Sequence, residues 1–335
     1  MIKKLKCVII GYGYMGQIRH KSLLLNKKDV QIVGVYDTDN SKLIKTLNKK
    51  LIIKSYKDIF DLNFDIAFIC TPNNISTKVA IDCLRKNKNV FCEKPPGKNL
   101  KDLNKIKKYI KKNRKIMFGF NHRFHPAVVM AKKIVDSKKY GQIITIRGVY
   151  GKSGGIDFKK SWRNNKKFSG GGILLDQGIH MIDLFRYFCG NFNKVKCFTS
   201  NLFWNFNVED NAVLILKNSK NQLAHLHSSS TLWRHTFRIE MTLKNGYIII
   251  EGLLSKTGSY GQEKITYGPR QFENISQAIG NPSEHVVYFD KDDSWNLEIS
   301  KFINYTKYNK KVAENNFNDA HNAMKIIESA YRNAR

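Results

Sequence analysis

The stretch CVIIGYGYMG at residues 7–16 decides the fold, because an apolar run ends there in a glycine-rich turn. Residues 6–11 have the length of a short buried strand, and a helical pattern follows to about residue 28. Gly11, Gly13 and Gly16 stand in the G-x-G-x-x-G spacing at this strand-to-helix junction. The spacing predicts a turn that binds a dinucleotide.

Each of the three glycines has a separate predicted task. Gly11 permits the tight turn, Gly13 lets the backbone approach a pyrophosphate, and Gly16 lets helix and strand pack closely. The free N–H groups and partial positive charge at the start of the helix favour the phosphates. We therefore expect all six residues of the motif to contact the cofactor: Gly11, Tyr12, Gly13, Tyr14, Met15 and Gly16.

Asp37 bears on which dinucleotide is bound. It ends the next predicted strand, residues 30–37, and follows Gly16 by 21 residues, near the spacing of an acid that accepts from ribose hydroxyls. A carboxylate there would repel a 2′-phosphate, so the sequence favours NAD over NADP. The nearby Lys42 and Lys45 could soften that choice.

Predicted strands and helices alternate as far as residue 122, and beyond it the alternation ends. The alternation predicts β-α-β units and a parallel sheet with right-handed crossovers. After residue 122, extended segments crowd together, and Asn245-Gly246 is a strong hairpin signal. We expect an α/β Rossmann domain, a doubly wound parallel sheet, over residues 1–122. Residues 123–335 should form an α+β domain with a large, mostly antiparallel open sheet. The main helices are expected at residues 41–50, 73–87, 100–113, 126–138, 173–189 and 318–334.

Composition excludes several classes of protein. Of the 335 residues, 42% are hydrophobic, which excludes a disordered chain. The net charge is +31, but the lysines are spread along the chain and arginine is scarce, so no nucleic-acid partner is expected. The apolar runs are too short for a membrane span or a signal peptide, so we expect a cytoplasmic protein. The six cysteines contain no C-x-x-C pair and predict core thiols rather than disulfides or a zinc site.

Two further motifs follow predicted strands. Thr71 is the last residue of the predicted strand at residues 65–71, and Pro72 and Asn73 follow it, at the ends of the strands where such folds bind ligands. An ordinary strand-to-helix turn is the alternative. Glu93-Lys94-Pro95 ends the strand at residues 89–94, and a lysine there can hold a substrate oxygen. A plain surface lysine is its alternative.

The segment GGGILLDQGIHMID at residues 170–183 carries polar groups in an apolar helix. Asp176, His180 and Asp183 stand at i, i+4 and i+7, on one narrow stripe. Buried carboxylates and imidazoles need partners or a task, and a hydrogen-bonded Asp–His pair of the core is the alternative. No further ligands cluster nearby, so no metal is expected. Gly178 inside the helix costs about 1 kcal/mol relative to alanine, which a close neighbour, cofactor or strand, would explain.

The combination of motifs resembles the glucose–fructose oxidoreductase / inositol dehydrogenase / MocA family. The resemblance implies a Rossmann domain plus a domain whose open sheet forms a homodimer or homotetramer. It also implies NAD-dependent oxidation or reduction of a secondary alcohol or ketone on a sugar, an inositol or a nucleotide-sugar. The matching segments are GYGYMG (11–16), VYDTD (35–39), CTPNN (70–74), EKPPG (93–97), GFNHRFHP (119–126) and residues 161–183.

The resemblance also assigns roles to residues. Lys94, Asp176 and His180 match the family's catalytic lysine, aspartate and histidine. Pro96 departs from the pattern, where a non-proline residue is common, and should stiffen the loop after Lys94. Besides the motif and Asp37, the expected cofactor contacts are Thr71, Pro72, Asn73, Glu93, Lys94, Asn121, Trp162 and Arg163. The expected substrate contacts are Lys94, Arg123, Arg163, Asp176, Gln177 and His180.

The implied chemistry needs a base for the hydroxyl proton and a cation for the developing alkoxide. His180 suits the base and Lys94 the cation, although the sequence leaves open which of the two takes the proton. Cations near the site, including Arg123 and Arg163, favour a nucleotide-sugar, while an inositol or other polyol is the alternative substrate. A non-catalytic, dinucleotide-binding regulator is the alternative of another class.

Overall fold

The computed structural model describes residues 4–155, 157–271 and 283–334. Their contacts divide the chain into two compact units. The first holds the residues up to Asn121, together with Lys167–Gly170 and Trp295–His321. The second holds His122–Lys166, Gly171–Ser294 and the chain from Asn322 onward. The chain thus returns to the first unit near its end, whereas the sequence places everything after residue 122 in the second domain.

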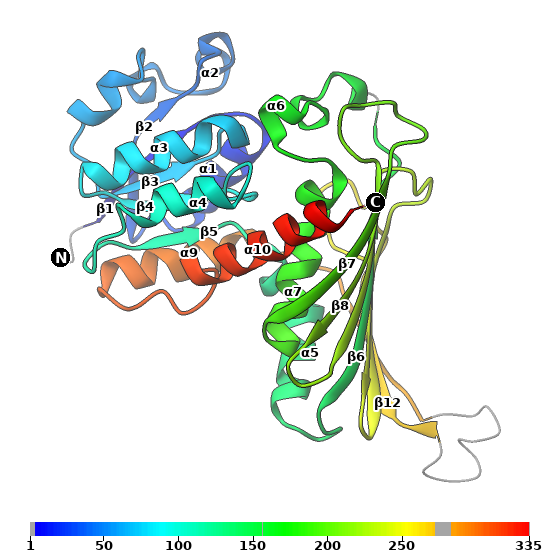
Figure 1. The fold of residues 1–335 in the computed structure, drawn as a ribbon. Helices are drawn as coiled ribbons and strands as arrows, with labels where there is room; N and C mark the ends of the chain where they lie inside the picture. Colours follow the sequence, from blue (N-terminus) through cyan, green and yellow to red (C-terminus); the bar gives the residue numbers. More distant parts are fainter. Residues whose placement is uncertain (1–3, 156, 272–282, 335) are drawn as a thin grey trace. The chain divides into compact units, whose positions relative to one another are not determined.

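The first unit is a parallel sheet with helices. Its strands are β1 (Leu5–Ile10), β2 (Val30–Tyr36), β3 (Ile66–Ile69), β4 (Asn89–Cys92) and β5 (Ile116–Phe118). Its helices are α1 (Tyr14–Leu25), α2 (Asn40–Thr46), α3 (Asn73–Arg85), α4 (Leu100–Lys107) and most of α9 (Ser294–Lys307). The strand order is β2-β1-β3-β4-β5 and every pairing is parallel (Figure 1). Neighbouring connections diverge at β1 and β3, a place where such sheets bind ligands beyond the strand ends.

Helix α9 joins the first unit through its apolar face. The Phe302 ring lies edge-on to Phe68 of β3 at 6.2 Å and packs against Phe91 of β4 at 5.6 Å. Lys307 also pairs with Asp29, at 2.5 Å. No local signal in the sequence reveals these partners, because they lie more than two hundred residues away along the chain. The packing explains why Trp295–His321 belongs to the first unit.

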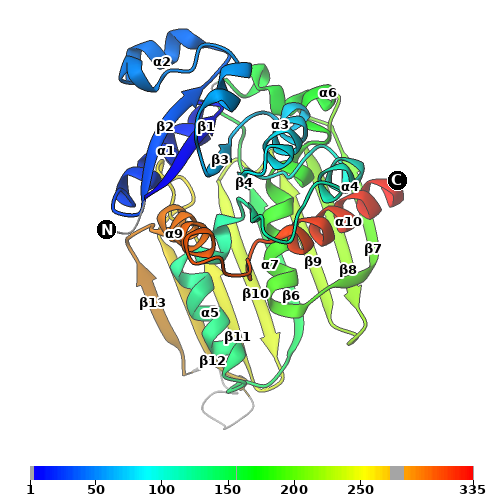
Figure 2. The ribbon, with the colours of Figure 1, turned by 90° about the vertical axis from the view of Figure 1, so that its left-hand side faces the viewer.

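The second unit is a large sheet covered by helices on one face (Figure 2). Its order is β13-β12-β11-β10-β6-β9-β8-β7, and all neighbours are antiparallel except β6 and β9. The strands are β6 (Ile143–Gly151), β7 (Phe192–Ser200), β8 (Asn211–Asn218), β9 (Leu223–Ser229), β10 (Thr236–Leu243), β11 (Gly246–Glu251), β12 (Glu263–Pro269) and β13 (His285–Phe289). The helices on that face are α5 (Pro126–Asp136) and α7 (Ile179–Cys189). The fold class expected from the sequence is confirmed.

Buried and exposed side chains alternate along the strands, as expected for a sheet covered on one face. In β8, Leu214 and Leu216 are fully buried, while Ile215 between them is 54% exposed. The hairpin predicted at Asn245-Gly246 joins β10 to β11, where Leu243 pairs with Gly246. Strands β12 and β13, by contrast, were not expected from the sequence. The face turned away from α5 and α7 is called the outer face below.

The expected helix at residues 173–189 differs in its first turn. Leu174–Gly178 forms a π-helical turn, and α7 starts only at Ile179. A Cβ at position 178 would lie 2.8 Å from the Leu174 side chain of the same turn and 3.3 Å from Ser228 on β9, so a strand is one of the two close neighbours of Gly178. Two other expected helices end early: α2 at Thr46 and α4 at Lys107. The final helix, α10, spans Phe317–Asn333.

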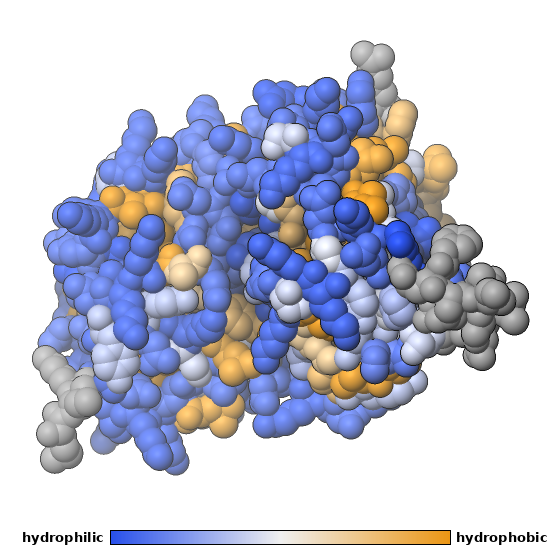
Figure 3. Space-filling view, turned by 90° about the horizontal axis from the view of Figure 1, so that it is seen from below, coloured by the Kyte–Doolittle hydropathy of each residue, from blue (hydrophilic) through white to orange (hydrophobic). Residues whose placement is uncertain are grey.

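The surface reflects the composition. Figure 3 shows a face dominated by hydrophilic residues, with separate hydrophobic patches between them. In the described parts of the chain, no helix has both the length and the apolar character of a bilayer span. All six cysteines are free thiols, and five are buried, as the expectation of core thiols requires: Cys7, Cys83, Cys92, Cys189 and Cys197.

Candidate active site

The glycine-rich turn in the first unit has the geometry its spacing predicts. Gly11 has a φ of +93°, and a Cβ there would lie 2.7 Å from the Cys70 carbonyl, so only glycine fits without strain. A Cβ on Gly16 would lie 2.1 Å from the Gly11 oxygen, which explains the close packing of turn and helix. No described atom lies within 4 Å of a Cβ on Gly13, so the backbone there is open to a ligand. No side chain caps the start of α1, which leaves its first N–H groups for phosphate oxygens.

Asp37 lies beside this turn. Its Oδ2 accepts from the Tyr12 backbone N–H at 2.5 Å, and its Oδ1 accepts from the Asp39 N–H at 2.9 Å. Each carboxylate oxygen keeps a second lone pair, which suits a pair of ribose hydroxyls. The backbone therefore orients the carboxylate before any cofactor binds.

The ends of β3 and β4 supply further groups of the first unit. Asn73 begins α3 and donates from Nδ2 to the Ser169 carbonyl at 2.8 Å, so its amide holds a backbone segment. The Thr71 Oγ1 and Asn74 Oδ1 atoms are buried and have no hydrogen-bond partner among the described residues. Such atoms fit an edge that a polar ligand completes. Pro72 precedes α3 as its N-cap residue.

Glu93, expected to contact the cofactor, is held inside the protein. It is buried, and its Oε1 accepts from Nε of the fully buried Arg19 at 2.5 Å. The Arg19 guanidinium also pairs with Glu298 at 2.8 Å and lies over the rings of Phe91 and Trp295. Arg19 thus links α1, the end of β4 and α9. The Glu93 carboxylate sets the position of the chain at Lys94, which is half-buried and follows directly.

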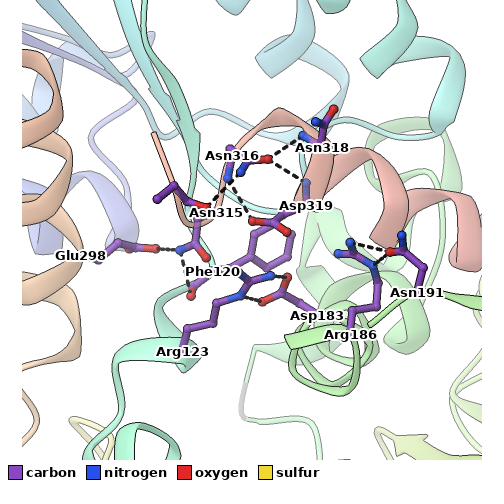
Figure 4. A network of polar contacts seen from close by, with 11 residues as sticks. Phe120, Arg123, Asp183, Arg186, Asn191, Glu298, Asn315, Asn316, Asn318 and Asp319 are labelled. Carbon is purple, nitrogen blue, oxygen red and sulfur yellow. Dashed lines mark hydrogen bonds and ion pairs between the residues drawn. The ribbon is translucent and has the colours of Figure 1, made fainter. Parts of the chain in front are cut away.

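Asn315 completes this buried cluster. Its Nδ2 donates to Glu298 Oε1 at 3.0 Å and to the Phe120 carbonyl at 3.2 Å (Figure 4). Asn121, expected near the nicotinamide, follows Phe120 and is only 1% exposed. The cluster therefore supports the backbone next to two expected site residues, Lys94 and Asn121.

Glu298 gives the cluster a pH dependence. Burial raises its pKa to about 8, an effect that Arg19 opposes and Glu93 reinforces. Between the ordinary value of 4.5 and about 8, the folded chain holds a proton that the unfolded chain has lost. Stability should therefore fall as pH rises through this window, by up to about 1.4 kcal/mol per pH unit.

Glu298→Gln should remove this slope, because glutamine does not titrate. We expect the free energy of unfolding of the variant, measured by urea denaturation from about pH 5.5 to about pH 8, to fall less steeply than that of the wild type. Other titrating groups cancel in the comparison. Parallel curves would mean that Glu298 is ionised throughout.

The second unit holds Asp176 on the π-helical turn. Its carboxylate lies 3.4 Å from Lys152 Nζ and 3.4 Å from Arg163 Nε. The Arg163 guanidinium also lies over the Trp162 ring, 4.6 Å from its centre. Two cations therefore converge on one half-buried carboxylate. The sequence placed Lys152 among the cations near the site that favour a nucleotide-sugar, but did not predict its contact with Asp176.

His180 lies on α7 and is buried. Its ring stacks on that of His122, with centres 3.8 Å apart, and His122 Nε2 lies 3.2 Å from the Tyr150 hydroxyl. Burial raises the pKa of Tyr150 well above its usual value, so this phenol stays neutral. His122 and Tyr150 were not expected in the site, because no local signal in the sequence shows which side chains lie beside His180.

Gln177 lies next to this group. Its Nε2 donates to the Tyr260 hydroxyl at 2.9 Å, while its buried Oε1 has no hydrogen-bond partner in the described parts of the chain. The stripe expected for Asp176, His180 and Asp183 assumed a regular α-helix. The π-helical turn shifts Asp176 relative to the other two, a change typical of functional sites.

Arg123 was expected to contact the substrate, but in the structure it pairs with a buried carboxylate. Its Nε and Nη2 donate to both oxygens of the buried Asp183, at 2.7 and 2.6 Å (Figure 4). Arg123 is only 6% exposed and lies over the Tyr187 ring. Its charge is paired with that of Asp183 inside the second unit, so its guanidinium is not an exposed anchor for an anionic substrate. Asp183 is thereby a structural partner rather than a third member of a reactive stripe.

Glu209 shapes the π-helical turn and was missed in the sequence. Its carboxylate accepts from the Gly172 and Leu174 N–H groups and from the Tyr331 hydroxyl at 2.8 Å. A Cβ on Gly172 would lie 2.1 Å from the Glu209 carbonyl oxygen. The run of glycines therefore lets this carboxylate hold the segment that carries Asp176.

Two family models match this chain, one in its N-terminal part and one in its C-terminal part. Residues 5–122 match the model of an oxidoreductase family with an NAD-binding Rossmann fold. Residues 128–249 match the GFO/IDH/MocA C-terminal domain. This chain belongs to the GFO/IDH/MocA oxidoreductase family. The residues matched by the model of the NAD-binding Rossmann fold include the parallel sheet and its glycine-rich turn.

Individual relatives are similar over parts of their length. Levoglucosan dehydrogenase of Pseudarthrobacter phenanthrenivorans is 34% identical over 145 residues, 42% of this chain and 37% of that protein. Myo-inositol 2-dehydrogenase of Thermotoga maritima is 30% identical over 189 residues, 54% of each chain. The matches thus span from about a third to about half of these curated relatives. The solved myo-inositol 2-dehydrogenase of Lactobacillus plantarum has a TM-score of 0.79 at 26% identity, over 99% of this chain and 97% of that one.

Asp37 leads to a prediction on the cofactor. NADH should bind more tightly than NADPH, because the carboxylate accepts from ribose hydroxyls and repels a 2′-phosphate. Asp37→Asn should weaken NADH binding by about tenfold or more. It should also reduce the preference for NADH over NADPH. Fluorescence titration with both cofactors measures this, with the exposed Asp61→Asn as the matched control. Equal dissociation constants in the wild type would show that nearby lysines outweigh Asp37.

Proposed function

We propose that this protein is an NAD-dependent oxidoreductase that transfers a hydride between the nicotinamide and a secondary alcohol or ketone of a sugar or sugar derivative. The observation that carries the proposal is the open glycine-rich turn with Asp37 oriented beside it. The chain belongs to the family and carries Lys94, Asp176 and His180 at the positions that match the family's catalytic groups. We further propose that these three residues act on one substrate.

The roles follow from the chemistry of the side chains. NAD, when bound, accepts the hydride from the carbinol carbon. His180 takes the hydroxyl proton, and Lys94 stabilises the negative charge that develops on the oxygen. Asp176, held between Lys152 and Arg163, accepts hydrogen bonds from substrate hydroxyls and fixes the sugar. In the reverse direction His180 returns the proton as the ketone is reduced.

A neutral sugar or polyol is the substrate that the second unit suits best. Lys152 and Arg163 are both engaged by Asp176, and Arg123 by Asp183, so none of the three is left as a simple phosphate anchor. Carboxylate, amide and imidazole groups such as those of Asp176, Gln177 and His180 are the usual partners of hydroxyls. The relatives named after levoglucosan and myo-inositol support this class.

A nucleotide-sugar is the second candidate, favoured by the exposed Lys159, Lys160 and Lys166. Its diphosphate would be attracted by these cations, and salt screens such attraction. For a nucleotide-sugar, kcat/KM should fall several-fold as salt rises from about 50 to about 300 mM. A flat response, with good turnover of an uncharged sugar or inositol, would leave the neutral polyol as the substrate.

The experiment that tests the function combines binding with turnover. Fluorescence titration should show NADH binding, and a panel of sugars, inositols, sugar phosphates and nucleotide-sugars should yield NADH from NAD with at least one compound. Binding without turnover anywhere on the panel would favour a dinucleotide-binding regulator. The Lys94→Ala variant separates turnover by this protein from turnover by a contaminating enzyme.

We also propose a homodimer or homotetramer that assembles through the outer face of the large sheet. Apolar side chains are exposed there, with Phe198 of β7 at 65% and Ile215 of β8 at 54%. Such side chains on a broad sheet favour a second copy over water. Light scattering on the purified protein measures the assembly. We place the enzyme in the cytoplasm, where NAD is available and the six thiols stay reduced.

A further inference from the structure

A cavity lies in the first unit, away from the glycine-rich turn. It has a volume of about 790 Å³ and is lined by residues 112–116 and by residues from 309 to 318. Residues 112–116 form the approach to β5 and its first residue, so the cavity lies at the amino end of that strand. The glycine-rich turn follows the carboxyl end of β1, which runs parallel to β5 in the same sheet. The two sites therefore lie at opposite ends of the parallel strands of one sheet.

The cavity is lined by cations, and no carboxylate stands among its described lining residues. Four of its lining residues are basic, namely Lys112, Arg114, Lys115 and Lys311, and none is acidic. Lysine is common in this chain, so charge alone would not mark a site. One of these cations is buried and has no counter-ion among the described residues, which distinguishes the cavity from an ordinary basic surface.

Lys115 is 9% exposed, yet it forms no ion pair within the part of the chain that the structure describes. Its ammonium donates to the Asn309 carbonyl at 3.4 Å, although an ammonium has three N–H donors. The Nε atom of Arg114 is also buried without a described hydrogen-bond partner. A buried cation is normally paired, so these two side chains suit an anionic ligand.

The remaining walls point to the class of ligand. Ile116, Val312 and Phe317 supply apolar surface, and the amides of Asn113 and Asn316 stand among them. Cations together with an aromatic ring and amides suit a molecule that has a phosphate group and a flat, nitrogen-containing ring. The volume is also in the range of sites for molecules of that size.

We propose that this cavity is a second ligand site, which binds a mononucleotide through Lys115 and Arg114. The phosphates pair with these two cations and with Lys311, and the base lies against Phe317 and Val312. The site is independent of the dinucleotide turn, so it fills when NAD is already bound. The ligand contacts the segment that carries Asn315, which bonds the buried Glu298.

The test uses ATP, without a divalent cation, as the probe and saturating NADH to occupy the dinucleotide turn. Calorimetry should detect one ATP per chain. Lys115→Met should weaken ATP binding by about tenfold or more, because a charge-assisted contact is lost. Lys311→Ala, a change at an exposed position, should weaken it by about two- to fivefold. Lys101→Ala, an exposed lysine on α4 outside the cavity, should bind ATP as the wild type does.

Each outcome bears on the proposal. Lys115→Met should unfold at a temperature no lower than the wild type, because it removes an unpaired buried charge. Displacement of ATP by NADH would overturn the proposal, since ATP would then occupy the dinucleotide turn. Equal binding by the wild type and both cavity variants would also overturn it. Tripolyphosphate should bind more weakly than ATP, and equal affinity would show that the apolar wall recognises no base.

Discussion

Lys94→Ala is expected to lower kcat by about 10²–10⁴-fold, the usual loss when an electrostatic or acid–base group is removed. The residue lies two positions after the end of β4, and the Glu93–Arg19 pair fixes the chain at that point. Because Lys94 acts on the substrate oxygen, the affinity for NADH should change little. Steady-state kinetics on the best substrate of the panel, together with NADH titration, measures both quantities.

The matched control is Lys101→Ala, which removes an exposed lysine from the neighbouring helix α4. It should keep wild-type kcat and wild-type NADH affinity, so any loss in Lys94→Ala is not a general effect of charge. A Lys94→Ala variant that turns over its substrate near the wild-type rate would remove Lys94 from the mechanism.

Arg19→Met should be the most destabilising single change in the first unit. Arg19 is fully buried and pairs with Glu93 and Glu298, so its loss leaves the buried Glu93 carboxylate and the buried Glu298 carboxyl group without their cation. Breaking a buried ion pair in this way costs about 3–5 kcal/mol. Urea denaturation should show that loss, and the variant should regain part of it at lower pH, where the carboxylates take up protons.

The control for this change is Arg332→Met, which replaces an exposed arginine near the end of α10. Its free energy of unfolding should lie within about 0.5 kcal/mol of the wild type. If Arg19→Met were equally mild, the cluster would not hold α1, β4 and α9 together, and its proposed support of Lys94 would fall with it.

The parts of the site that the sequence predicted are those with local signals. The turn at Gly11–Gly16 and Asp37 depends on spacing along one β-α-β unit, and the structure places Asp37 against the backbone of that turn. The parallel and antiparallel sheets likewise follow from the rhythm of strands and helices. Short-range patterns determine such features, so a single sequence reveals them.

The parts that were missed depend on distant partners. Arg19 looks like one more basic residue of a helix, because its partner Glu93 lies 74 residues away and Glu298 further still. Arg123 was expected to face the substrate since arginine is scarce here, yet Asp183 engages it. The π-helical turn at Asp176 depends on contacts of the glycine run with Glu209, which no periodicity encodes.

The central claim is that this protein moves a hydride between a sugar carbinol and NAD, and isotope transfer tests it most directly. The best substrate of the panel would be prepared with deuterium on its carbinol carbon and incubated with the protein and NAD. Mass spectrometry of the nicotinamide product should then show one deuterium per NADH formed, with the sugar converted to the ketone in equal amount. NADH that binds tightly, with no deuterium transferred from any labelled sugar or inositol of the panel, would contradict the claim.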